Sequence, residues 1–129
     1  MSNILFGDAK ATARAADATQ KHRELAQARA RFEENPTRET QTALATALFD
    51  VGRFEEAERL LRDIIATYGE DIQTLYDLAF TLKNLKQQDE MRKAFMRVVE
   101  LGPRHPLARS AEHELWMMDP AFVPSWMRR

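Results

Sequence analysis

The sequence predicts an all-α protein made of stacked two-helix units. Three observations carry this prediction. Only four Gly and five Pro occur among 129 residues, and the segments between them have helix length and are rich in strong helix formers. No segment alternates apolar and polar residues over the length of a strand. The chain also matches itself at a shift of 34 residues, a period typical of stacked helical hairpins.

Six helices are expected between these breakers, over residues 8–34, 37–50, 54–68, 71–85, 88–101 and 106–118. Asp8 and Thr37 can each accept a hydrogen bond from a first-turn amide. Thr37 is followed three residues later by Thr40 rather than by Glu or Gln, so it is expected to cap its helix without a full capping box. Gly52 and Gly69 suit the left-handed position that ends a helix.

The 34-residue period pairs the four central helices with one another. It aligns Leu44 with Leu78, Ala45 with Ala79, Leu48 with Leu82, Leu61 with Phe95 and Ile64 with Val98. The intervening turns align as well, residues 50–53 with residues 84–87. Two positions differ in kind, because Gln88 stands where the first unit has Phe54, and Met91 where it has Ala57. These changes are expected to loosen the crossing of the second helix pair.

This pattern resembles the tetratricopeptide repeat, which has two helices in about 34 residues. The segment 52–58, with the sequence GRFEEAE, is the part most similar to that family. The resemblance implies a short right-handed solenoid with repeats at 38–71 and 72–105. The helix at 106–118 continues the register and is expected to cap the second repeat.

The segments outside the two repeats have their own character. In the capping helix, Glu112 and His113 replace the Leu-Ala pair of the repeats, which indicates a polar face. The long first helix does not fit the repeat register. We therefore expect three regions: an N-terminal helical extension at 1–37, a repeat domain with its capping helix at 38–118, and an apolar tail at 119–129.

Composition limits the classes of partner. Lys and Arg number 19 against 20 Asp and Glu, and this near balance argues against a nucleic-acid-binding protein. No apolar run approaches the roughly 20 residues of a membrane span. The first ten residues lack the basic segment of a secretory signal. There is no cysteine. A cytoplasmic protein with no membrane span and no nucleic-acid partner is expected.

The sequence lacks the motifs that carry catalysis or hold a cofactor. His22, His105 and His113 are not in an H-E-x-x-H arrangement, and no glycine-rich phosphate loop is present. The acidic cluster at 55–58 is expected to interact favourably with the helix dipole rather than to act as paired catalytic carboxylates. We expect no enzymatic activity, no cofactor and no metal site.

The resemblance implies that the first helix of each repeat lines a concave face. The positions left over from helix packing form the candidate partner-binding site: Thr42, Thr46, Phe49, Tyr76, Asp77, Phe80, Lys83 and Asn84. The aromatic members Phe49, Tyr76 and Phe80 are candidate anchors for a peptide or a helix. They could equally fill space beneath the N-terminal helix or the tail.

A carboxylate clamp of the kind found in some members of the family is not expected. Thr42 and Thr46 occupy two of the first-helix positions, and Asp77 replaces an Asn of such a clamp. A partner held by its C-terminal carboxylate, as chaperone tails are, is therefore disfavoured.

Both flanks carry apolar residues that need an explanation. The N-terminal helix has a thin stripe of Ala9, Ala13, Ala16, Leu25, Ala28 and Phe32. Small residues permit close packing, on the repeats or on another protomer. The tail is rich in Trp and Met, and its prolines prevent a continuing helix. It is expected to run extended and either to cover the last repeat or to serve as a recognition segment.

These observations favour a protein–protein interaction module without catalytic activity. An adaptor, a scaffold or an assembly factor would bind a peptide or a helix in the groove. The alternative is a structural protein that associates with itself through the N-terminal helix or the tail. The fold supports these functions by analogy.

Overall fold

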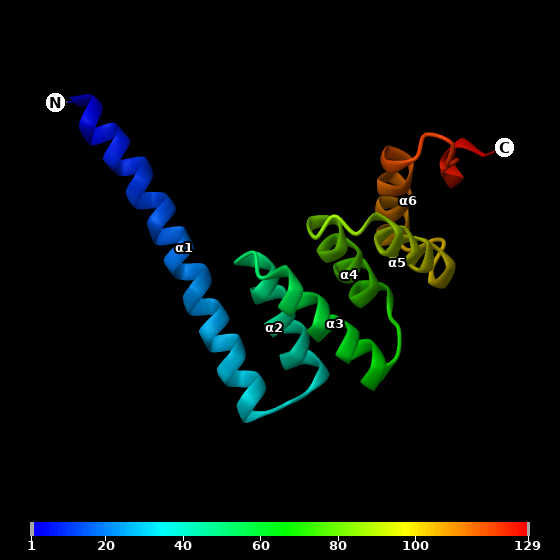
Figure 1. The fold of residues 1–129 in the computed structure, drawn as a ribbon, viewed down its shortest axis with the longest axis horizontal. Coiled ribbons are helices and arrows are strands. Elements are labelled where there is room, and N and C mark those ends of the chain that lie inside the picture. Colours follow the sequence, from blue (N-terminus) through cyan, green and yellow to red (C-terminus); the bar gives the residue numbers. More distant parts are fainter. Residues whose placement is uncertain (1, 129) are drawn as a thin grey trace. The chain divides into compact units, whose positions relative to one another are not determined.

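The computed structural model describes the backbone of residues 2–128 and the side chains of residues 9–128. Six α-helices and a 3₁₀-helix follow one another (Figure 1): α1 Ser2–Glu34, α2 Arg38–Asp50, α3 Phe54–Tyr68, α4 Ile72–Asn84, α5 Gln88–Leu101, α6 Pro106–Met118 and η1 Ser125–Met127. No strand occurs among the described residues. The predicted all-α class is confirmed.

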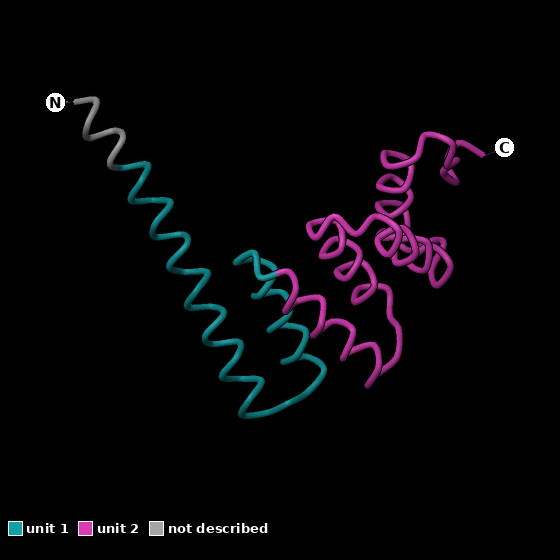
Figure 2. Tube along the Cα trace, in the orientation of Figure 1, with its two compact units in different colours: residues 1–53 teal, residues 54–129 magenta. Residues whose placement is uncertain are grey.

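The chain forms two compact units (Figure 2). Residues 1–53 contain α1 and α2, and residues 54–129 contain α3 to α6 with η1. The region boundaries predicted from the repeat pattern, after residues 37 and 118, stay predictions.

In the first unit, α1 packs against α2 and is longer than the sequence predicts. It begins at Ser2, so the expected start at Asp8 is wrong and Asp8 lies within the helix. Gly7 costs a helix only about 1 kcal/mol relative to alanine and does not break it. Leu25 and Ala28, in the last third of α1, are its buried apolar side chains among those described.

The start of α2 is held by a reciprocal pair of threonines. The Thr37 hydroxyl accepts a hydrogen bond from the Thr40 amide at 3.1 Å, and the Thr37 amide donates to the Thr40 hydroxyl at 2.9 Å. The expectation of a cap without a full box is therefore wrong, because threonine supplies the acceptor that Glu or Gln usually provides. At the other end of α2, Gly52 has φ +81°, the left-handed conformation predicted for it.

In the second unit, α4 is the central helix and contacts α3, α5 and α6. Figure 1 shows it running between α3 and α5. The largest buried side chains of this unit come from several helices and include Ile64, Leu82, Phe95 and Val98. Ala57 on α3 is fully buried, which agrees with its small size in the repeat pattern.

The tail contacts α6 through a buried carboxylate. Glu112, expected on a polar face, is only 2% exposed. One of its oxygens accepts from the Ser125 hydroxyl at 2.9 Å, and the other accepts from the Ser125 amide. Pro124 is fully buried beside this contact, whereas Trp126 and Met127 are exposed. The Glu112–Ser125 contact and the buried Pro124 therefore hold the tail to α6, and Phe122 is half-buried.

Candidate protein-binding cleft

Three aromatic rings cluster where α4 meets α5. Tyr76 and Phe80 lie one turn apart on α4, with ring centroids 4.9 Å from each other. Both rings meet Phe95 of α5 edge to face, at 6.2 Å for Tyr76 and 5.3 Å for Phe80. Phe95 is fully buried, and the two α4 rings are half-buried. Tyr76 and Phe80 therefore cover the core with one face and keep the other accessible.

A cleft of about 440 Å³ opens beside this cluster. Its lining residues come from α4, α6 and η1: Tyr76, Arg109, Ser110, His113, Glu114 and Trp126. The Arg109 guanidinium lies 5.3 Å from the centroid of the Trp126 ring, within cation–π range. We call this site the aromatic cleft.

Lys83 is connected to the aromatic cleft by its ion pair with Glu114, although it does not line the cleft itself. Its Nζ atom lies 2.8 Å from a carboxylate oxygen of Glu114 and 5.4 Å from the centroid of the Phe80 ring. Both charged side chains remain partly exposed. The pair fixes the position of Glu114 at the rim and neutralises its charge.

Two of the predicted α4 residues are engaged within their own helix. The Asn84 side-chain amide donates to the carbonyl of Phe80 at 2.9 Å. Gln73 donates to the Asp77 carboxylate at 2.8 Å. Burial raises the pKa of Asp77 above its ordinary value, and the hydrogen bond from Gln73 opposes that rise in the pKa. Asp77 is thus a half-buried carboxylate with a helix partner.

The predicted residues of α2 belong to the first unit. Thr42 and Phe49 are half-buried, and Thr46 is exposed with its hydroxyl donating to the Thr42 carbonyl at 3.1 Å. Their place in a shared binding face with α4 stays a prediction.

The α6 side of the aromatic cleft was missed in the sequence, although the repeat period carried the signal. A further shift of 34 residues from Tyr76 leads to Ser110, and the same shift from Phe80 leads to Glu114. The first helix of each repeat thus has a counterpart in α6, which both caps the second repeat and lines the cleft. The repeat period could not predict that Trp126 lines the cleft, because the tail lies outside the repeat register.

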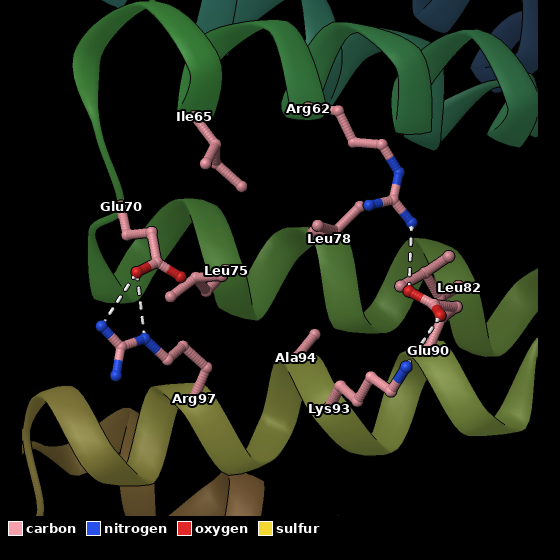
Figure 3. A pocket seen from close by; sticks show the side chains of 10 residues that line it. All are labelled: Arg62, Ile65, Glu70, Leu75, Leu78, Leu82, Glu90, Lys93, Ala94 and Arg97. Carbon is pink, nitrogen blue, oxygen red and sulfur yellow. Dashed lines mark hydrogen bonds and ion pairs between the residues drawn. The ribbon is translucent and has the colours of Figure 1, made fainter.

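A second groove, of about 320 Å³, lies between α3 and α5 above the apolar residues of α4 (Figure 3). Arg97 contacts Glu70 at 2.9 Å at one end of it. At the other end Glu90 contacts Arg62 at 3.7 Å and Lys93 at 3.4 Å. Each of these rim charges has an oppositely charged partner, and two of the ion pairs connect α5 with α3 and with the α3–α4 turn.

Within the described residues, no group of three or more His, Cys, Asp or Glu side chains could hold a metal ion. In the same part of the chain, no helix is both long enough and apolar enough to cross a membrane.

Comparison with known proteins identifies one family. Residues 38–81 match the family model of the tetratricopeptide repeat. The match covers α2, α3 and most of α4, and it confirms the resemblance expected from the sequence. No curated protein and no solved structure gives a significant match to the chain.

Proposed function

The chain carries a tetratricopeptide repeat in residues 38–81, and from this premise we propose that it is a non-catalytic module that binds another protein in the aromatic cleft. Repeats of this kind generally mediate protein–protein interaction and are generally non-catalytic. An adaptor, scaffold or assembly factor acting in the cytoplasm fits this proposal.

The observation that carries the proposal is the meeting of Tyr76, Arg109 and Trp126 in one cleft. Tyr, Trp and Arg are the residue types most enriched among the few side chains that supply most of the energy of protein interfaces. Each combines a large apolar surface with a polar group, which suits a site that is solvated when empty. A peptide or a helix laid along α4 and α6 would cover all three.

The remaining predicted residues extend this proposal. Lys83 is paired with Glu114, which lines the cleft, and Asn84 follows Lys83 on α4. Thr42, Thr46 and Phe49 of α2 would contribute to the same partner if the concave face predicted from the repeat register is continuous.

The test begins by capturing the partner with the tagged full chain and identifying it by mass spectrometry. Calorimetric titration then compares the wild type with Tyr76→Ala and Trp126→Ala. Each variant is expected to weaken binding by about 2 kcal/mol, roughly 30-fold. Met96→Ala is the matched control, because Met96 is comparably exposed on α5 but does not line the cleft. Unchanged affinity in both cleft variants would exclude this site.

Self-association is the second candidate function. All described side chains of α1 before Leu25, residues 9–24, are exposed, so this stretch leaves a long helical surface available to a second copy of the chain.

A further inference from the structure

A second cleft carries charges and side chains unlike those of the aromatic cleft. It has a volume of about 330 Å³ and lies between the α4–α5 turn and the end of α6. Three of the six methionines of the chain, Met91, Met117 and Met118, line it together with Lys83, Lys86 and Glu114. We call it the methionine cleft. Its volume is at the lower end of ligand sites in proteins, about 300–1,000 Å³.

Several residues that differ in type between the two repeats line the methionine cleft. Lys86, Gln88 and Met91 all line it. They stand where the first repeat has Gly52, Phe54 and Ala57. Residues that break the local pattern of a fold concentrate at functional sites, because folding alone would favour the regular residue. Three such residues meeting in one cleft therefore indicate a role for it.

Lys86 is the clearest of these departures. Its φ of 60° is left-handed, and it is the one non-glycine residue with positive φ in the described part of the chain. The equivalent Gly52 adopts φ +81° without strain. Because this backbone conformation favours glycine, the presence of a lysine indicates that its side chain has a role other than folding.

The apolar part of the wall of the methionine cleft consists of the three methionines, and the other lining residues are polar or charged. Met117 is 67% exposed, the largest exposure among the exposed large apolar side chains, whereas Met91 is buried. Methionine has three flexible bonds and a polarisable sulfur, so such surfaces repack around apolar side chains of different shapes. The chemistry of these walls thus fits an aliphatic or aromatic side chain of a ligand.

The rim of the methionine cleft is positive. Lys83 is neutralised by Glu114 at 2.8 Å, whereas Lys86 has no carboxylate partner among the residues that the structure describes. A ligand that brings a carboxylate beside its apolar side chain would pair with Lys86. A second copy of this cleft would bring a like charge and is disfavoured.

We propose that the methionine cleft is a second docking site, which binds an acidic peptide segment through an apolar side chain of that segment. The Lys83–Glu114 pair lies between this cleft and the aromatic cleft. The two sites share Glu114, but their other lining residues differ, so variants of those residues test each site separately.

The test measures the binding of two short fluorescent peptides by anisotropy. The first carries two leucines one helical turn apart among glutamates, and the second has lysine in place of every glutamate. The full chain is expected to bind the acidic peptide at least about tenfold more tightly than the basic one. Equal binding of the two peptides, or no binding of the acidic one, would overturn the proposal.

Four variants locate the bound peptide. Met117→Ser and Lys86→Gly are each expected to weaken binding of the acidic peptide about tenfold, whereas Met96→Ser and Lys93→Gln, exposed positions outside the cleft, leave it unchanged. Lys86→Gly should melt at the same temperature as the wild type or higher, because glycine relieves the left-handed conformation. Unchanged binding in Lys86→Gly or Met117→Ser, or equal losses in the controls, would refute the assignment.

The Tyr76→Ala variant separates the two clefts. It is expected to bind the acidic peptide like the wild type, even if the partner of the aromatic cleft is lost. A loss of acidic-peptide binding in this variant would place the peptide in the aromatic cleft and overturn the proposal.

Discussion

Asp77 shows how one half-buried carboxylate links stability to pH. Burial raises the pKa of Asp77, so the charged form is less favourable in the folded than in the unfolded chain. Protonated Asp77 therefore stabilises the folded chain, and this stabilisation is complete below the ordinary pKa of 3.8. It is lost as the pH rises through the higher pKa that Asp77 has in the folded state. Asp77→Asn should therefore melt at a higher temperature than the wild type at pH 7, and the difference should shrink below pH 3.8.

Thermal melts of both proteins across this pH range provide the measurement. Asp63→Asn serves as the control, since Asp63 is exposed in the middle of α3. A difference between Asp77→Asn and the wild type that does not vary with pH would contradict the role assigned to burial.

Ala57 tests the packing of the repeat. Its side chain is fully buried, so Ala57→Trp should overpack the site and lower stability by about 1–3 kcal/mol or more. For a chain of this size, each kcal/mol corresponds to a shift of several degrees in the melting midpoint. Ala66→Trp is the matched control, because Ala66 is exposed on the same helix. Equal midpoints for the two variants would show that the site is not closely packed.

At the scale of the element, helix ends were predictable where the breakers are strong. The structure gives α3, α5 and α6 the predicted bounds. A glycine or a proline closely follows each of these helices, and Pro106 opens α6, whereas α5 begins after Lys86 and Gln87, which are not helix breakers. The start of α1 was not predictable by the same means, because a single glycine is a weak breaker and Gly7 lies inside the helix.

The tail was predictable only in its composition. Its prolines excluded a long helix, but nothing in the sequence paired Ser125 with Glu112, 13 residues earlier. Glu112 occupies the repeat position of Leu78, so the register predicted a position that faces the core and the residue type predicted a polar one. In the structure Glu112 faces the core and is also polar, because the tail supplies hydrogen bonds to its buried carboxylate.

This contact leads to a prediction for the tail. Ser125→Ala removes the hydroxyl that donates to Glu112 and should lower stability by about 1.5 kcal/mol, as expected for a hydrogen bond to a charged group. Truncation after Asp119 should lower it further, because it also removes Pro124 from its buried position. Chemical denaturation measures both effects. Ser110→Ala, an exposed serine on α6, is the control. If the truncated chain is as stable as the full one, the tail does not stabilise α6.

At the scale of the whole molecule, the sequence predicted one of the six residues that line the aromatic cleft. The apolar period of α4 placed Tyr76 off the packing stripe, and the structure makes it a wall of the aromatic cleft. The opposite wall depends on which helix and which part of the tail come to lie beside α4. Arg109 and Trp126 meet there through contacts that depend on the folded path of the chain. Such long-range juxtaposition is not encoded in a local pattern.

The composition of α1 argues against self-association through its exposed stretch. Between residues 9 and 24 every side chain is exposed, and this segment contains alanines, threonines, one histidine and charged or amide side chains but no large apolar residue. A stable interface buries about 800 Å² per partner around apolar or aromatic anchors. This stretch of α1 has an exposed surface but no large apolar or aromatic side chain to anchor an interface. Self-association through it is therefore disfavoured.

We therefore expect the chain to be a monomer of 14.9 kDa in solution. Size-exclusion chromatography with light scattering, over a roughly hundredfold range of concentration, should give the same mass throughout, because a weak dimer would gain mass with concentration. A constant mass of twice this value would instead support the self-associating alternative. In that case Ala16→Glu, which places a charge on the exposed alanine stripe, should restore the monomer if α1 forms the interface. The truncation after Asp119 should restore it if the tail does.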